Sequence, residues 1–279
     1  MTAAKTIAPS IDPDDFRIKP GTKIDLREMP TREKGGFTSR EEAEAELAFH
    51  RDRIITLQER LYAEHKQSLL IILQATDTGG KDGTVRHVFE GVNPQGVIVT
   101  SFKQPTPEEL DHDYLWRIHQ HTPGKGDIAI FNRSQYEDVL VVRIHGLVPK
   151  TVWKKRYQQI NYFEERLVES GTTIVKIFLH ISKEEQKERL QARLDDPDKR
   201  WKFNPSDLED RARWDDFQHA YADMLEKCST DLAPWYVIPA DRKWYRNVVV
   251  AAIVADALER MDPQYPAEFP GLDSIVIPD

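Results

Sequence analysis

LLIILQATDTGGKDGT, residues 69–84, is the stretch from which the fold of this chain follows. Its first five residues, Leu69–Leu73, are apolar without alternation, which is typical of a parallel strand buried on both faces. Gly79 and Gly80 then permit a tight turn with close backbone approach. A strand that turns through glycines into a helix directs several backbone N–H groups at one point, where the helix dipole adds positive potential. The stretch therefore predicts a phosphate-binding loop.

The charged residues of this loop refine the prediction. Lys81 supplies a mobile charge for outer phosphates, as the lysine of a P-loop does. The match to G-x-x-x-x-G-K-[ST] is incomplete, because Ala75 stands at the first glycine position and Asp82 at the Ser/Thr position. Asp77 would repel a phosphate unless Mg²⁺ lay between them, so it is the candidate metal ligand. A strand, turn and helix with merely solvated charges is the alternative that the loop alone leaves open.

Composition limits the class of protein. The chain has 279 residues, of which 39% are hydrophobic, enough for one large α/β domain with or without an appendage. Its one cysteine, Cys228, excludes an internal disulfide framework and favours a reducing compartment. We see neither a signal-peptide pattern nor an apolar run of about 18 residues, and therefore expect a cytoplasmic protein with no membrane partner.

The net charge of −8 argues against nucleic acid as a partner. A polyanionic substrate would therefore need local basic surface. Two segments provide it, since residues 150–156 hold four Lys or Arg and no acid, and residues 189–202 hold several more. Each segment taken singly is also compatible with a solvated helix face.

Hydrophobic patterning predicts strands at residues 69–74, 96–102, 127–131, 173–180 and 235–238. Helices are expected at 41–65, 83–89, 108–121, 151–169, 183–194, 206–228 and 245–258. Strands that alternate with helices indicate an α/β fold with a five-stranded parallel sheet flanked by helices. Residues 1–35, with four prolines and little periodicity, are expected to form an irregular N-terminal extension.

Ligands of such sheets bind beyond the carboxyl ends of the strands, where the loops after the first and third strands converge. This geometry predicts that Asp77, Lys81, Asn132 and Arg133 meet. P-loop enzymes usually hold Mg²⁺ with a carboxylate at the end of the third strand, and Asn132 is a weaker ligand there. The planar donors of Arg133 suit a transferring phosphate, although an exposed arginine at a strand end is the alternative. Glu137 either caps a helix or faces an acceptor.

The segment of about residues 195–214 is polar, basic and interrupted by prolines, which is typical of a lid that closes over phosphates. On closure it would bring Arg193, Lys199 and Lys202 to the phosphates. We expect Trp201 and Trp214 to be packing residues at its hinge. Three nearby histidines, His112, His119 and His121, lack the spacing of a zinc site.

Several stretches together resemble the type-2 polyphosphate kinases, also called polyphosphate:nucleotide phosphotransferases. They are DTGGKDGTVRHVFEGVNPQG (77–96), HDYLWRIHQHTPGKGDIAIFNRSQYEDVLVVRIHGLVP (112–149), RLDDPDKRWKFNPSDL (193–208) and WDDF (214–217). The resemblance spans roughly residues 35–262. It implies a thymidylate-kinase-like P-loop kinase domain over residues 36–262 with a lid at about 195–214, followed by a tail at 263–279. It also implies Mg²⁺-dependent phosphoryl transfer between inorganic polyphosphate and AMP, ADP or ATP, and a homo-oligomer.

The resemblance assigns roles by position. Asp77, Gly80 and Lys81 fall in the Walker A motif, and Asn132 and Arg133 fall where many members carry the Asp-Arg of Walker B. With Asn132 the chain is similar to the subgroup that phosphorylates both AMP and ADP. The resulting site assignments are catalytic for Asp77, Lys81, Asn132, Arg133 and Arg193, acceptor-side for Glu137, Asp82 and Lys202, and phosphate-binding for Gly79, Gly80, Gly83, Lys103, Lys154, Lys155 and Lys199.

Two other functions remain open from the residues alone. An ATP-dependent nucleoside or nucleotide kinase of the same fold would use the same loop. A nucleotide or polyphosphate sensor is a further possibility, because Asn132 weakens the usual metal carboxylate. The presence of both Lys81 and Asp77 argues against the sensor.

Overall fold

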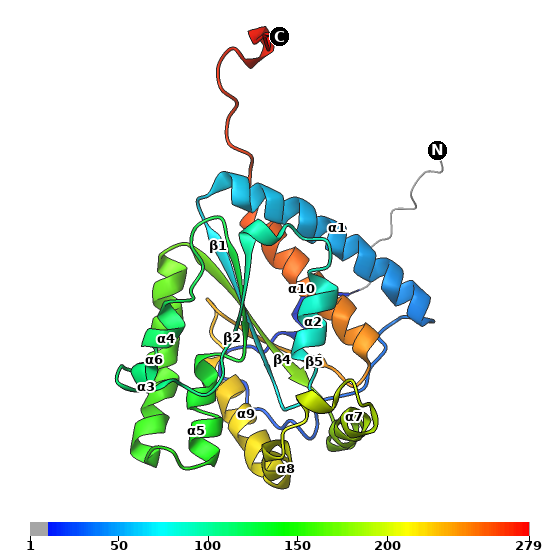
Figure 1. Cartoon of the computed structure of the whole chain (residues 1–279), viewed down its shortest axis with the longest axis vertical. Coiled ribbons are helices and arrows are strands. Elements are labelled where there is room, and N and C mark those ends of the chain that lie inside the picture. The colour runs from blue at the N-terminus through cyan, green and yellow to red at the C-terminus, as the bar shows by residue number, and fades with distance from the viewer. Residues whose placement is uncertain (1–10, 279) are drawn as a thin grey trace.

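A five-stranded parallel sheet in the order β2-β3-β1-β4-β5 forms the centre of the molecule (Figure 1). The computed structural model describes residues 11–278. Its strands are β1 (Ser68–Ala75), β2 (Val97–Ser101), β3 (Ile128–Asn132), β4 (Thr172–His180) and β5 (Trp235–Pro239). The predicted α/β class and all five predicted strands are confirmed. β1 is central and fully buried, as its unbroken apolar run indicated.

Helices cover both faces of the sheet (Figure 1). One face packs against α1 (Arg40–Glu64), α2 (Lys81–Val88) and α10 (Lys243–Met261). The other packs against α6 (Lys150–Glu169) and α9 (Trp214–Cys228). At the carboxyl ends of the strands lie α7 (Lys183–Asp195) and α8 (Ser206–Ala212). Short helices complete the set, namely α3 (Pro107–Leu110), α4 (Trp116–His119) and α5 (Val141–Ile144).

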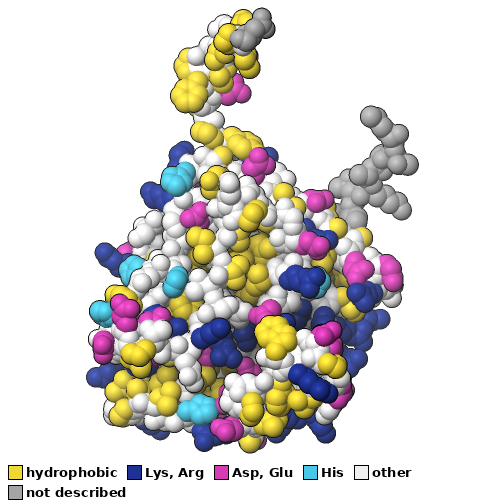
Figure 2. Space-filling view, viewed as in Figure 1, with side chains coloured by type: hydrophobic (Ala, Val, Ile, Leu, Met, Phe, Trp, Pro, Cys, Tyr) yellow, Lys and Arg dark blue, Asp and Glu magenta, His cyan; other side chains and the backbone are white. Residues whose placement is uncertain are grey.

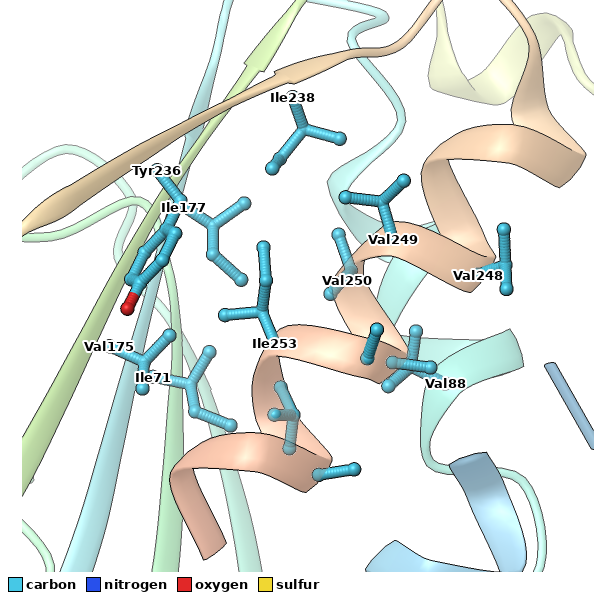
Figure 3. Packing of buried hydrophobic residues seen from close by; sticks show 14 of the residues in the cluster. Ile71, Val88, Val175, Ile177, Tyr236, Ile238, Val248, Val249, Val250 and Ile253 are labelled. Atoms are coloured by element: carbon cyan, nitrogen blue, oxygen red, sulfur yellow. The ribbon is translucent and has the colours of Figure 1, made fainter. Parts of the chain in front are cut away.

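Alternate residues of β1 enter two different cores. Ile71 packs in the core under α10, while Ile72 packs in the core under α6 and α9. Figure 3 shows Ile71, Val175 and Ile177 of the sheet directed toward Val250 and Ile253 of α10. Each such fully buried aliphatic side chain stabilises the fold by about 1.5–3 kcal/mol. This packing fixes the position of β1, and with it the start of the glycine turn.

Two helix predictions are wrong. Residues 108–121 form α3 and α4 instead of one helix, because Thr106 and Glu109 cap α3 reciprocally and the Asp113 carboxylate accepts a hydrogen bond from the Leu115 N–H to begin a new turn. Residues 206–228 form α8 and α9, separated at Arg213, whose backbone (φ −100°, ψ 27°) leaves the helical region.

The described part of the N-terminal extension, residues 11–35, lies along the β5 side of the sheet. The Ile18 N–H donates to the Trp235 carbonyl at 2.8 Å, and the Leu26 carbonyl lies 2.9 Å from His180 Nε2. Leu26 itself is buried. The segment is therefore irregular in structure but part of the packed domain.

At the other end of the chain, residues 263–278 leave the body beyond α10 (Figure 1). Figure 2 shows hydrophobic side chains exposed along this tail, which include Phe269, Val276 and Ile277. Within residues 11–278, no helix combines the length and the apolar character needed to cross a bilayer.

Candidate active site

The glycine turn between β1 and α2 has the geometry of a phosphate-binding loop. Gly80 stands at the amino end of α2 in the left-handed region (φ +99°), and Thr78 is also left-handed (φ +64°). Lys81 folds back so that its Nζ donates to the Ala75 carbonyl at 3.1 Å, across the mouth of the loop. The hydroxyls of Thr76 and Thr78 are buried and find no hydrogen-bond partner among residues 11–278. Buried unpaired hydroxyls at a turn of this kind indicate a place where a polar ligand binds.

Both glycines are required by close approach. A Cβ on Gly79 would lie 2.4 Å from the Ala75 Cβ and 2.9 Å from the Thr76 carbonyl oxygen. A Cβ on Gly80 would lie 1.9 Å from Nη1 of Arg246, which comes from α10. The loop is therefore held between its own strand and an arginine from the other end of the chain.

The loop that follows β3 forms the second wall of the site, as predicted. Parallel pairing aligns Leu73 of β1 with Asn132 of β3. Arg133 Nη2 donates to Asp77 Oδ1 at 2.7 Å, and Asn132 Nδ2 donates to Asp82 Oδ1 at 2.6 Å. The sheet order thus brings Asp77, Asn132 and Arg133 together.

The electrostatics of this wall shift the pKa values of several groups. Burial, followed by the charge of Arg133, lowers the pKa of Lys81 to about 8. Burial raises the pKa of Glu137, although the nearby charges of Arg133 and Lys81 oppose the change. The negative charge of Glu137 in turn raises the pKa of Arg133. A site in which cations and carboxylates shift one another in this way is typical of functional centres.

A cleft of about 830 Å³ opens over the glycine loop, and ten of its lining residues are Lys or Arg against three Asp. An acidic protein therefore has a strongly basic cleft, which suits a polyanion. The structure brings most of the predicted site residues to its walls, namely Asp77, Gly79, Gly80, Lys81, Asp82, Gly83, Lys103, Asn132, Arg133, Arg193, Lys199 and Lys202.

Lys154 and Lys155 lie elsewhere. Both are exposed on α6, and neither belongs to the described residues that line the cleft. The neighbouring Arg156 of the same basic segment is paired with Asp138 at 2.6 Å. Lys154 and Lys155 therefore lie on an exposed helix face, the alternative that the sequence left open, whereas Arg156 is mostly buried.

Four cations of the cleft were not among the sequence candidates: Arg86, Arg189, Lys243 and Arg246. Arg246 is only 2% exposed, and within residues 11–278 its guanidinium donates to the side-chain oxygen of Asn247, 2.8 Å from Nη2, and to no carboxylate. Burial, followed by the charge of Arg189, lowers the pKa of Arg246 to about 9. A buried cation without a carboxylate partner is costly, and a bound anion would offset that cost.

Arg189 has a different place in the site. Its Nη1 donates to the carbonyls of Thr78 and Gly79 at 3.0 and 3.2 Å, and its Nη2 donates to the carbonyls of Ala240 and Asp241 at 2.7 and 3.1 Å. The side chain therefore ties the glycine loop to the end of β5. From the sequence, Arg189 was only one member of a basic cluster, and no pattern predicted that it would contact the glycine loop.

A second hollow adjoins the cleft at Asp77 and Arg133. Glu137 lines it, together with the apolar or aromatic side chains of Val141, Trp214, Phe217 and Tyr221. Charged groups at one end and aromatic side chains at the other suit a ligand with a phosphate and a planar ring. Trp214 contributes to this wall from the first turn of α9.

The predicted lid residues lie at the edge of the cleft. Arg193 Nη1 lies 3.2 Å from the Lys202 carbonyl and 3.5 Å from Asp207 Oδ2, and Lys199 is paired with Asp196 on the surface. Trp201 is 78% exposed, so its predicted role as a packing residue is wrong. It lines the cleft instead, beside Lys202.

Asp77 is the predicted metal ligand. Within residues 11–278 no group of three or more His, Cys, Asp or Glu side chains is arranged to hold a metal ion. Asp77 borders both hollows, however, and one carboxylate suffices for Mg²⁺ when phosphate oxygens and water supply the other ligands. The residues therefore fit a metal that enters with the phosphates and do not form a metal cage of their own.

Known proteins that are similar to this chain agree with the phosphate-binding geometry of the site. The model of the family described as Polyphosphate kinase 2 (PPK2) matches residues 37–266. The AMP/ADP-polyphosphate phosphotransferase of Meiothermus ruber is 52% identical over 263 residues, covering 94% of this chain and 98% of the relative. The ADP-polyphosphate phosphotransferase of Rhodopseudomonas palustris is 43% identical, covering 91% and 92%. The crystal structure of Polyphosphate Kinase 2 from Arthrobacter aurescens TC1 superposes with a TM-score of 0.92 at 43% identity, covering 97% of each chain.

Replacing Gly80 by alanine tests the close approach of Arg246 to the loop. We expect Gly80→Ala to lower the affinity for tripolyphosphate at least about 10-fold, because the new methyl group displaces the Arg246 guanidinium. Gly21→Ala is the matched control, since Gly21 also has positive φ (+74°) but no atom within 4 Å of its Cβ position. The affinity of both folded variants for tripolyphosphate can be measured by calorimetric titration. Equal affinities of the two variants would contradict the assignment.

Proposed function

The chain belongs to the polyphosphate kinase 2 family, and from this premise we propose that it transfers the terminal phosphoryl group of inorganic polyphosphate to AMP and ADP. The reaction yields ADP and ATP. The observation that supports this function most strongly is the basic cleft over the glycine loop, which adjoins a partly aromatic hollow at Asp77 and Arg133. A linear polyanion suits the first and a nucleotide the second.

In this proposal the two substrates meet between the loops after β1 and β3. A phosphate oxygen of the acceptor attacks the terminal phosphorus of the chain. The bond from that phosphorus to the bridging oxygen breaks, and the shortened chain leaves with that oxygen. An ionised acceptor phosphate needs no strong base, so positioning and charge compensation supply most of the catalysis.

The cations have distinct roles in the proposed mechanism. Lys81 and Arg133, which both line the cleft, offset charge on the transferring phosphoryl group. Arg246 and Lys243 of α10 hold phosphates further along the chain. Arg193, Lys199 and Lys202 approach from the lid. Glu137 orients the acceptor nucleotide in the hollow.

We also propose that the divalent metal of this family's chemistry is Mg²⁺, held here by Asp77 together with substrate phosphates. When bound, the ion would offset the negative charge that develops on the phosphates. Asp77 also accepts a hydrogen bond at 2.7 Å from Nη2 of Arg133. Asp77 thereby holds the guanidinium at the boundary between the two hollows.

The remaining expectations stay predictions. A cytoplasmic location and the three-part division of the chain at residues 35 and 262 come from the sequence alone. The homo-oligomer is supported by strand β2, whose outer edge has no backbone partner among the described residues and which exposes Ile98 and Val99. An apolar open edge of this kind is a ready surface for a second copy.

Loss of the loop lysine tests the proposed function. With polyphosphate as donor and AMP as acceptor, we expect Lys81→Ala to reduce product formation at least about 100-fold, the scale of one preorganised charge contact. The exposed Lys125→Ala is the control and should retain full activity. A folded Lys81→Ala protein with near-normal turnover would refute the role of the loop, and an inactive wild-type protein would refute the donor.

The pKa of Lys81 predicts a pH dependence. The lysine binds phosphate only when protonated, and its pKa in the free protein is about 8. We therefore expect kcat/KM for polyphosphate to be constant below about pH 7.5 and to fall as pH rises through 8, because kcat/KM follows groups of the free enzyme. Lys81→Arg should abolish this fall, since arginine stays protonated. A flat wild-type profile up to pH 9.5 would contradict the prediction.

A further inference from the structure

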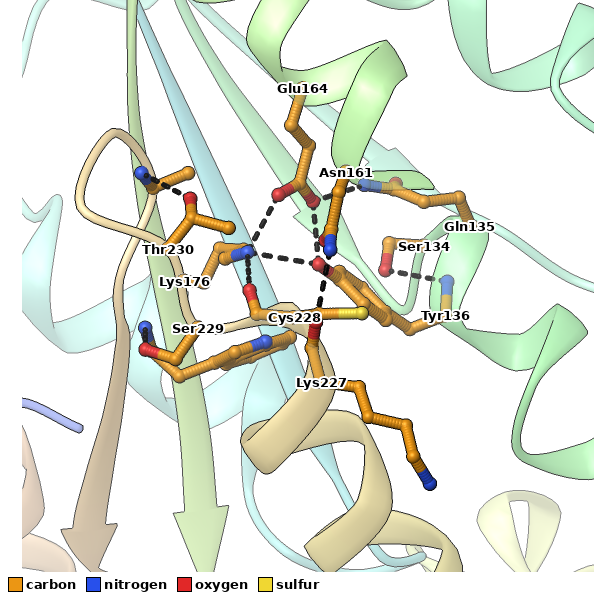
Figure 4. A network of polar contacts seen from close by, with 12 residues as sticks. Ser134, Gln135, Tyr136, Asn161, Glu164, Lys176, Lys227, Cys228, Ser229 and Thr230 are labelled. Atoms are coloured by element: carbon orange, nitrogen blue, oxygen red, sulfur yellow. Dashed lines mark hydrogen bonds and ion pairs between the residues drawn. The ribbon is translucent and has the colours of Figure 1, made fainter. Parts of the chain in front are cut away.

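A buried ion pair lies beneath the loop that follows β3 (Figure 4). Lys176 of β4 donates from Nζ to Glu164 Oε2 of α6 at 2.6 Å. Neither side chain is more than 2% exposed. Lys176 also donates to the carbonyl of Cys228 at the end of α9 and to the hydroxyl of Tyr136 at 2.9 Å. All three donors of the ammonium group are thus used, on three different elements.

The same carboxylate holds the loop itself. Glu164 Oε1 accepts from the Tyr136 hydroxyl at 2.7 Å and from Gln135 Nε2 at 3.0 Å. Figure 4 shows both side chains directed from the loop into this network. Tyr136 is further fixed by edge contact of its ring with Trp235, at 4.9 Å between centroids. Two adjacent loop residues are therefore anchored on one buried charge.

The anchored residues lie between two groups of the active site. Arg133 stands two positions before Gln135, and Glu137 comes directly after Tyr136. Between β3 and α5 the loop has only the single 3-10 turn Gln135–Asp138. Arg133 is moreover left-handed (φ +63°), a conformation that costs a bulky residue about 1–2 kcal/mol. The anchors on Glu164 hold the middle of this short, strained loop, while Asp77 and Arg156 bind its two ends at Arg133 and Asp138.

A buried ion pair contributes little net stability to a core, because removing two charges from water costs free energy. Apolar side chains of similar volume usually stabilise a core as well or better. The position of this ion pair beneath a loop of the active site points to a task other than stability. The network is fully hydrogen-bonded at the lysine, and it joins β4, α6 and the end of α9 to the loop. The network therefore fixes the loop after β3 relative to the rigid core.

We propose that Lys176, Glu164 and Tyr136 form a positioning network that sets Glu137 for the acceptor nucleotide and Arg133 for the phosphoryl group that this nucleotide receives. None of the three touches the cleft or the hollow. The inference rests on the proposed function in so far as Glu137 faces the acceptor. It adds the claim that acceptor recognition depends on a charge pair buried beneath the site.

Tyr136→Phe is the sharpest variant, because it removes one hydroxyl and keeps the ring and the ion pair. We expect it to raise KM for AMP about 3- to 10-fold, the scale of one lost hydrogen bond, and to leave KM for polyphosphate within about twofold. Tyr157→Phe is the matched control, since Tyr157 of α6 is also buried but accepts its hydrogen bond from Arg143, away from the loop. It should change neither KM.

A paired replacement separates positioning from stability. Lys176→Met with Glu164→Leu removes both charges and fills the space, so the thermal unfolding midpoint should fall less than in Lys176→Met alone. The double variant should nevertheless show a raised KM for AMP, because Gln135 and Tyr136 have lost the Glu164 carboxylate as their hydrogen-bond acceptor. The proposal would be overturned if the double variant recovered a normal KM for AMP along with its stability. Equal changes in the KM for AMP and the KM for polyphosphate would also overturn it.

Hydrogen exchange of the backbone amides of residues 134–140 keeps this test independent of the proposed function. Tyr136→Phe should lower their protection while Tyr157→Phe leaves it unchanged, whichever donor the enzyme uses. Unchanged protection in Tyr136→Phe would overturn the positioning role. If the wild-type protein did not use polyphosphate, polyphosphate would be refuted as the donor. KM for AMP would then be compared between the variants with the donor that the protein does use.

Discussion

The convergence of cations on the carboxyl end of β1 is the constraint on which the rest of the structure depends. The sheet order places the ends of β1 and β3 side by side, and the glycine turn lets Arg189 and Arg246 approach the loop backbone. These charges are costly to bury unless an anion or a carbonyl faces them. Arg189 is satisfied by four carbonyls, whereas Arg246 and Lys81 face the cleft with few acceptors. The site is thus prepared for phosphates before any ligand arrives.

An acidic protein can therefore bind a polyanion without a basic surface. The net charge of −8 limits nonspecific attraction of nucleic acid, while the cleft concentrates ten Lys or Arg side chains within one concave region. The Asp77–Arg133 pair lies where this cleft meets the second hollow. That boundary divides a region suited to a phosphate chain from one suited to an aromatic ring. Transfer between two such substrates is what this division of the site permits.

Much of this arrangement was predictable, and the failures have identifiable causes. The unbroken apolar run of β1 and the rule for loops at the carboxyl ends of parallel strands correctly brought Asp77, Asn132 and Arg133 together. The same rule applied to β5 would have indicated Arg246, which lies in the first turn of the helix after that strand, but no motif drew attention to it. Trp201 was misjudged because an exposed tryptophan is uncommon, and hydrophobicity alone does not distinguish a core from a cleft wall. The network of Lys176 joins residues distant in sequence, so no local pattern signals it.

The central claim is that polyphosphate itself is the phosphoryl donor. The most direct test is to incubate the protein with Mg²⁺, ADP and polyphosphate labelled with phosphorus-32, and to measure label in the γ-phosphate of ATP after chromatography. Adding hexokinase and glucose would trap each ATP formed and prevent exchange. The account predicts label in the trapped glucose phosphate at a rate equal to loss of chain phosphate. An unlabelled product, or transfer seen only when ATP is supplied as donor, would contradict it and favour an ATP-dependent nucleotide kinase of the same fold.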